Sequence, residues 1–278
     1  MSRITALMAV AALLLPVPAL ADELIRQAND QESLAMTVAH VHASEQALDS
    51  RGSSVVDEES GSQLQIGYDT VRTRALFGVP GFYTNLEIFL GGADMGYAGS
   101  SFNPMTGAVE PNNGGFDVAT ESVRLRVGRS REFGADGHVA LTPFLGLSQQ
   151  AWLRNSSTDS PFSAYNHVAA EIGILAQASL TRKLVLGTDA SLGRTLSGLL
   201  IDGHNLTWPH NATTSSFALY LDNRTYADWH QRLEIRQSFL RYGEPAYAGG
   251  LFEPRRNSAA AIMLEMGTEK DLFKTLFY

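Results

Sequence analysis

The segment between Tyr226 and Leu240 alternates between polar and apolar side chains with a period of two residues. One side of the alternation carries the ionisable residues Asp228, His230, Arg232, Glu234 and Arg236. The other side carries Ala227, Trp229, Gln231, Leu233, Ile235, Gln237 and Phe239. A period of two is that of a β-strand. A row of ionisable groups excludes a dry core and an apolar row avoids water, so the pattern favours a closed barrel with lipid outside and a polar lumen.

Ten such segments are predicted along the chain, and short and long connections alternate between them. They are Leu34–Ser44, Ser62–Phe77, Phe82–Gly92, Phe116–Arg131, His138–Arg154, Ala164–Leu180, Leu184–Gly198, Ser215–Leu221, Thr225–Leu240 and Ser258–Glu269. An even strand number with short turns on one side and long loops on the other is typical of bacterial barrels. The sequence therefore predicts an all-β, antiparallel transmembrane β-barrel of ten strands, or of eight if the weak first segment and one other are not strands.

The predicted connections are polar or rich in turn-forming residues. Gly78-Val79-Pro80-Gly81 and Asp222-Asn223-Arg224 have the residue types of tight turns. The predicted long loops are Glu45–Gly61, Ala93–Gly115, Leu199–Thr214 and Arg241–Asn257. We expect the short turns to face the periplasm and the long loops to face the cell exterior.

A soluble β-sandwich also alternates and is the rival fold, because a solvated sheet face can carry charges. The short and long connections and the N-terminal segment favour the barrel. Arg3, the apolar run Ile4–Leu15 and Ala19-Leu20-Ala21 are typical of a cleaved signal peptide over residues 1–21. The expected organisation is then a periplasmic segment over 22–33, a barrel over 34–269 and a tail over 270–278.

The predicted inward positions of the other strands supply opposite charges to the row between Tyr226 and Leu240. The predicted lumen charge network consists of Asp69, Glu87, Arg124, Arg126, Glu171, Asp189, Asp228, His230, Arg232, Glu234 and Arg236. Buried opposite charges must pair to offset their desolvation. A small barrel has little free lumen, so the network predicts a filled interior, with a narrow selective channel as the alternative.

Two further patterns bear on the membrane boundary. Aromatic residues at predicted strand ends suit interfacial girdles, and they are Phe77, Phe82, Phe116, Phe133, Trp152 and Tyr165. Arg72 and Arg74 fall on the lipid face by parity. Near the periplasmic end the cost of such an arginine is about 0–1 kcal/mol.

The closing segments Phe252–Asn257 and Met263–Gly267, and the terminal aromatic Tyr278, are similar to the last loop and final strand of a known class. In its pattern, most of the chain resembles the small outer-membrane β-barrel proteins of Gram-negative bacteria. The resemblance implies contact with outer-membrane lipid and lipopolysaccharide, and a monomer. The segment Lys270–Tyr278 departs from the family pattern because it does not extend the alternation, and we expect a short periplasmic tail.

Candidate chemistry is sparse. Asp202 and His204 are an acid and a histidine two residues apart in a predicted loop, and such a pair can activate water as a general base. Outer-membrane proteases carry Asp and His at the barrel mouth, and lipid A deacylases use Ser and His, but His138 and His167 lack an evident serine partner in the sequence. His40 and His42 share a predicted inward face, where no third metal ligand is evident.

Composition narrows the function classes. The chain has no cysteine, which excludes disulfides, thiolate metal sites and cysteine nucleophiles. The net charge of −8 without a basic patch argues against nucleic acid as a partner. No cofactor or metal is predicted. The sequence favours a structural or adhesin-like role in which the long loops bind an extracellular ligand, with an outer-membrane hydrolase or a narrow channel as alternatives.

Overall fold

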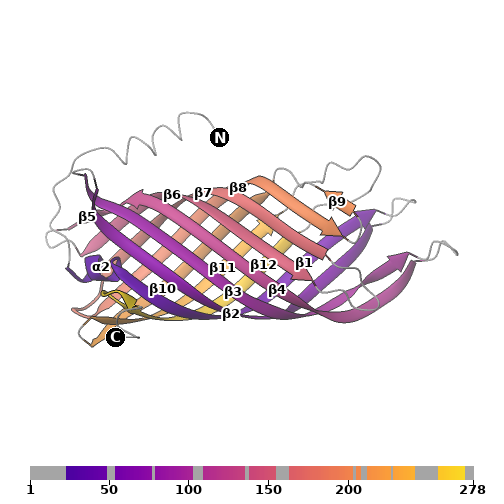
Figure 1. The fold of residues 1–278 in the computed structure, drawn as a ribbon, viewed down its shortest axis with the longest axis horizontal. Helices are drawn as coiled ribbons and strands as arrows, with labels where there is room; N and C mark the ends of the chain where they lie inside the picture. The colour runs from indigo at the N-terminus through magenta and orange to yellow at the C-terminus, as the bar shows by residue number, and fades with distance from the viewer. Residues whose placement is uncertain are drawn as a thin grey trace.

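The chain forms a closed antiparallel β-barrel, which confirms the predicted fold class (Figure 1). The computed structural model describes residues 23–48, 54–76, 79–102, 109–134, 138–154, 163–202, 205–207, 212–226, 228–241 and 256–272. Ten long strands form the ring in the order β10-β11-β12-β1-β2-β3-β4-β6-β7-β8, and pairing of β8 with β10 closes it. The two other strands of the described residues, β5 and β9, extend the sheet by three residues each.

The strand bounds give the barrel two different ends. The strands are β1 Gln31–Leu48, β2 Ser54–Leu76, β3 Val79–Phe102, β4 Val109–Arg129, β5 Arg131–Phe133, β6 Val139–Arg154, β7 Ser163–Ser179, β8 Leu184–Asp202, β9 Asn205–Thr207, β10 Thr213–Tyr226, β11 Trp229–Arg241 and β12 Arg256–Thr268. At one end the connections are short, as between Leu76 and Val79 and between Tyr226 and Trp229. We call this the short-turn end, and the opposite end the long-loop end.

The outer wall of the barrel carries an apolar band. Side chains that are exposed there include Leu34, Met36, Val38, Leu64, Ile66, Leu90, Leu125, Leu145, Leu147, Ile174, Leu192, Leu219, Leu233, Ile235, Ile262 and Leu264. The alternate positions of the same strands are buried and mostly polar. Apolar residues outside and polar residues inside are the reverse of a soluble sandwich and are the arrangement of a membrane barrel. Among the described residues, no helix is long and apolar enough to cross a membrane.

Strands β2, β3 and β4 are longer than predicted, with 23, 24 and 21 residues. The ranges Glu45–Gly61 and Ala93–Gly115, predicted as loops, are therefore mostly strand. The alternation continues there with its character reversed: Ala93 and Met95 are buried, whereas Asp94 is exposed on the outer face. Beyond the apolar band the outer wall faces water, so it becomes polar, and a polar stretch was misread as a loop.

Two predicted boundaries at the short-turn end were also wrong. Asp222-Asn223-Arg224 is not a turn, because β10 continues to Tyr226 and pairs Asp222 with Arg232 of β11. The alternation of inward Tyr220 and Asp222 with outward Leu221 explains this, since polar residues may occupy the inward face. The first strand begins at Gln31 rather than Leu34.

A short helix, α2 (Glu23–Ala28), lies at the short-turn end of the lumen (Figure 1). Leu24, Ile25 and Ala28 are buried in a cluster with Ala140 of β6 and Val185 of β8. This part of the predicted periplasmic segment is therefore packed against the inner wall, where it covers that end of the lumen.

Candidate functional site: a charged cluster that fills the lumen

The lumen contains a cluster of arginines and carboxylates that come from both sides of the ring. Arg124 and Arg126 project from β4, and Arg232 and Arg236 project from β11. In the closed ring, β4 and β11 are on opposite sides. The carboxylates that face them are Asp69, Glu87, Glu171, Asp189, Asp222, Glu234 and Glu265. We call these eleven residues the charged cluster.

Glu87 of β3 is the centre of one half of the cluster. Arg236 Nη1 donates a hydrogen bond to Glu87 Oε2 across the lumen at 2.9 Å. Arg124 and Arg126 approach the same carboxylate at 3.5 and 3.6 Å. Arg126 also donates to Asp189 of β8 at 2.5 Å. Because Glu87 is shared by three arginines from two opposite walls, it connects those walls directly.

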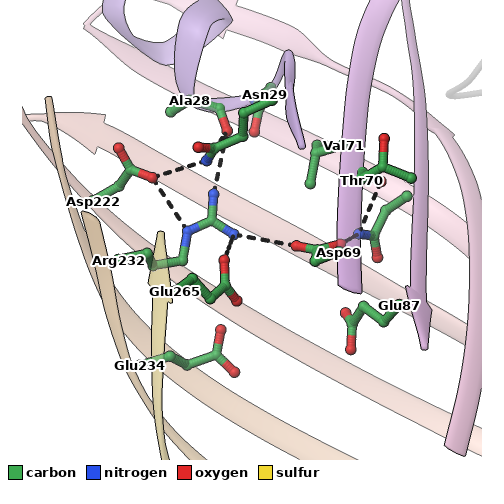
Figure 2. Close-up of polar contacts among 12 residues, drawn as sticks. Ala28, Asn29, Asp69, Thr70, Val71, Glu87, Asp222, Arg232, Glu234 and Glu265 are labelled. Atoms are coloured by element: carbon green, nitrogen blue, oxygen red, sulfur yellow. Dashed lines mark hydrogen bonds and ion pairs between the residues drawn. The ribbon is translucent and has the colours of Figure 1, made fainter. Parts of the chain in front are cut away.

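Arg232 is the centre of the other half (Figure 2). Its Nε donates to Asp222 at 3.3 Å, and its Nη1 lies 3.5 Å from Glu265 and 3.8 Å from Asp69. Its Nη2 donates to the carbonyl oxygen of Ala28 at the end of α2, at 3.2 Å. The guanidinium therefore joins three strands and the N-terminal helix, and its planar set of donors suits such a multiple contact.

Aromatic rings complete the filling of the lumen. The guanidinium of Arg126 lies 4.6 Å from the ring centre of Phe144, and that of Arg232 lies 4.6 Å from the ring centre of Tyr220. Both distances are in the range of cation–π contacts. Glycines on neighbouring strands make room for the rings, since a Cβ at Gly173 would collide with Phe144 and a Cβ at Gly187 would collide with Tyr220. The cavity left inside the charged cluster is about 30 Å³, room for about two water molecules.

Polar side chains hold α2 against the cluster. The amides of Asn29 and Gln177 exchange two hydrogen bonds, at 2.7 and 2.9 Å. Gln31 donates to Asp222 at 3.0 Å. His230 contacts Asp222 through Nδ1 at 2.7 Å and Glu269 through Nε2 at 3.3 Å. Because each ring nitrogen of His230 faces a carboxylate, this buried histidine connects Asp222 of β10 with Glu269, which directly follows β12.

Of the predicted lumen residues, the structure places ten inside the barrel: Asp69, Glu87, Arg124, Arg126, Glu171, Asp189, His230, Arg232, Glu234 and Arg236. The eleventh predicted residue, Asp228, does not lie in the lumen. It lies in the tight turn before β11 and pairs with Lys270 at 2.5 Å. The hydrogen bond from Lys270 lowers the pKa of Asp228, and the same contact raises the pKa of Lys270. Its parity with His230 was overridden by the turn.

Two members of the charged cluster were missed in the sequence. Glu265 alternates with Leu264 and Met266, which are exposed on the outer wall, so its parity was a sufficient signal. Asp222 was hidden by the mistaken turn. Asn29 and Gln31 carry no charge and precede the predicted first strand, so nothing in the local sequence marks them. Gln177 shares the inward parity of Glu171 on its strand, but its pairing with Asn29 has no local signal.

Several other predicted positions are now located. His40 is exposed and His42 is half-buried on the outer face of β1, so they do not point inward. Among the described residues no group of three or more potential metal ligands is found. Arg72 and Arg74 are on the outer wall as predicted, where both contact Asp30 and Arg72 also pairs with Glu32.

Of the residues considered for a hydrolase, Asp202 ends β8, whereas His204 lies outside the described residues. His138 Nδ1 lies 3.1 Å from Ser179 Oγ. This pair is at the short-turn end of the barrel and not at the long-loop end, where Asp202 lies.

The prediction that Phe116 and Trp152 belong to an interfacial aromatic girdle is wrong, because both point into the barrel. Phe116 is buried and Trp152 packs against it, in a cluster with Val41, Met95 and Val118 inside the barrel. Both share parity with inward residues of their strands, such as Arg124 on β4 and Ser148 on β6. The Arg154 guanidinium stacks on the Phe116 ring at 3.7 Å. The long-loop half of the lumen therefore has an apolar, aromatic wall.

The sequence matches no protein-family model and no curated protein. Among solved structures, the chain is similar to the outer membrane protein OprG from Pseudomonas aeruginosa, with 10% identity, coverage of 86% of this chain and 95% of that one, and a TM-score of 0.36. It is similar to the β domain of the Bordetella autotransporter BrkA, with 12% identity, coverage of 82% and 98%, and a TM-score of 0.36. It is also similar to the translocator domain of the autotransporter NalP from Neisseria meningitidis, with 10% identity, coverage of 95% and 93%, and a TM-score of 0.33.

OprG is an outer membrane protein, and the other two structures are domains of autotransporters. All three TM-scores are below 0.5, and the proposals below rest on the lumen and the rim of this barrel.

Proposed function

We propose that the protein is a sealed outer-membrane barrel of a Gram-negative bacterium that acts at the cell surface as a binding protein. In this proposal the chain is exported through a cleaved signal peptide, works as a monomer, and contacts lipopolysaccharide and phospholipid through its apolar band. Its extracellular partner is bound at the long-loop end. The function is adhesin-like in that the barrel holds a recognition surface and conducts nothing.

The observation that carries the proposal is the charged cluster. Its ion pairs join opposite walls, as between Arg236 and Glu87, so a solute can pass only if these pairs are broken. Breaking a buried pair costs about 3–5 kcal/mol because a charge is left uncompensated. Helix α2 adds a second barrier at the short-turn end, where Arg232 and Gln177 hold it.

The long strands supply a surface for a partner. Strands β2, β3 and β4 rise beyond the apolar band, and Asp94, Asp117 and Glu121 are exposed on their outer face. The outer wall here is built to face water and not lipid. It therefore offers an ordered surface above the membrane to which a partner can bind.

The test is solute passage. The full mature chain is folded into phospholipid vesicles, and the folded fraction is measured by the band shift on a heat-modifiability gel. We expect vesicles that hold the folded protein to show no swelling in arabinose and no steady current in planar bilayers. A stable open-channel current from the folded wild-type protein would overturn the sealed barrel and support the narrow channel.

A further inference from the structure

On the long-loop side of the charged cluster, the lumen contains a second cavity of about 50 Å³. We call it the vestibule. Its polar lining is dominated by uncharged hydroxyl and amide side chains, namely Ser148, Gln150, Ser191, Thr214, Ser216, Ser238 and Asn257. Val41 and Trp152 lie on its apolar side. This composition differs sharply from the charged cluster directly beneath it.

The floor of the vestibule presents a donor and an acceptor side by side. Arg124 Nε lies 3.6 Å from Glu171 Oε2, an ion pair too long for a hydrogen bond. Among the described residues, Glu171 Oε2 is buried with no hydrogen-bond partner, and only 3% of the Glu171 side chain is exposed. Arg124 Nη1 lies 3.5 Å from Glu87 Oε2 and so belongs to the charged cluster. A guanidinium can only donate and a carboxylate can only accept, whereas a hydroxyl does both. A hydroxyl group of a ligand can therefore donate a hydrogen bond to Glu171 Oε2.

The apolar wall supplies the other half of the recognition. Trp152 packs on the cluster that contains Met95, Phe116 and Val118, which fixes the position of its ring. A sugar ring has one face of C–H groups and a rim of hydroxyls, so it can lie on an aromatic ring while its hydroxyls reach the opposite wall. A hydrocarbon would form no hydrogen bond with the hydroxyl and amide groups of the lining. An anion would meet Glu171, and a cation would meet Arg124.

We propose that the vestibule binds the neutral terminal sugar of an extracellular saccharide. A cavity of about 50 Å³ holds a few water molecules, so the site takes one edge of a terminal ring and not the interior of a long chain. Trp152 contacts the apolar face of the ring, the serines bind its rim, and Glu171 accepts a hydrogen bond from one hydroxyl. This inference deepens the proposed surface-binding function and rests on it.

The experiment measures sugar binding by the folded full mature chain. The protein is kept in lauryldimethylamine oxide, because glucoside and maltoside detergents would compete for the site. Fluorescently labelled protein is applied to an array of neutral and sialic acid-terminated oligosaccharides, and affinity for bound glycans is then measured by calorimetry. We expect binding to a subset of neutral glycans and none to the same glycans when capped by sialic acid.

Matched variants locate the site. Trp152→Ala and Glu171→Gln should each weaken binding at least tenfold, whereas Leu153→Ala, which changes the exposed neighbour on the outer wall, should leave it unchanged. If the heat-modifiability gel shows that Trp152→Ala does not fold, Trp152→Phe is used in its place, and Glu171→Gln is kept as the second variant of the site. Binding to no neutral glycan, or an equal loss in Trp152→Ala and Leu153→Ala, would overturn the inference. The vesicle experiment is independent, so a missing sugar site leaves the sealed barrel standing, and a current removes the sealed barrel alone.

Discussion

The charged cluster and the vestibule, which are the two halves of the lumen, differ in how their buried polar groups are paired. In the charged cluster, each arginine faces carboxylates from neighbouring or opposite strands, so the opposite charges offset one another. In the vestibule, small hydroxyl side chains face an aromatic wall, and Glu171 Oε2, where the two halves meet, has no hydrogen-bond partner among the described residues. The same barrel therefore uses one half for its own stability, and in our proposal the other half binds a ligand.

The largest effect is expected when Glu87, the residue at the centre of one half of the charged cluster, is replaced. Glu87→Ala leaves three arginines without their shared carboxylate, so we expect a loss of about 3–5 kcal/mol in the free energy of unfolding. The measurement is urea unfolding of the protein folded into vesicles. Glu121→Ala, on the exposed outer face, is the matched control, and we expect a change within about 0.5 kcal/mol. Similar losses in both variants would show that the cluster does not stabilise the barrel.

A smaller effect is expected at the contact that attaches α2. Asn29→Ala leaves the buried amide of Gln177 without its partner, which should cost about 1–3 kcal/mol. Hydrogen exchange of the α2 backbone amides measures the loss, and we expect faster exchange there than in the strands. The double variant with Gln177→Ala should be about as stable as either single variant, because both remove the same pair. Strictly additive losses would contradict a direct contact.

The smallest effect is expected in the vestibule. Ser191 and Ser216 share one hydroxyl contact at 2.8 Å, and both lie where water can replace the lost partner. Ser191→Ala should therefore lower the free energy of unfolding by about 1 kcal/mol or less. Urea unfolding under the conditions used for Glu87→Ala measures it. A loss as large as that of Glu87→Ala would erase the distinction between the two halves.

The alternation of polar and apolar residues predicted much of this structure. It fails where the outer face of a strand becomes polar or the inner face becomes apolar. It located Glu87, Arg126 and Arg232 because a strand in lipid places every second residue inside. The same rule applied to Phe116 and Trp152 would have placed them inside too, but they were assigned to a girdle because aromatics are common at strand ends. The parity was correct and the residue type misled.

Other features depend on contacts that no local pattern contains. The upper parts of β2, β3 and β4 were misread because their outer face is polar above the membrane. The place of α2 depends on Gln177 and Arg232, which are distant in the sequence. Asp228 continues the parity of β11, but a tight turn directs it to Lys270. Pattern therefore predicted the wall, whereas the ends of the wall and the helix that covers the lumen required the folded chain.

The contacts of α2 also determine when this helix can dock during assembly. The pairs that hold it join residues 148, 191 and 204 positions apart in the chain, namely Asn29 with Gln177, Gln31 with Asp222, and Ala28 with Arg232. Such separations carry a large loop-closure entropy until the strands between them are in place. Its partners are on β7, β10 and β11, and β12 must still join β1 to close the ring. The N-terminal helix of the described chain is thus among the last elements to settle, and the short-turn end of the lumen stays open until the barrel is nearly complete.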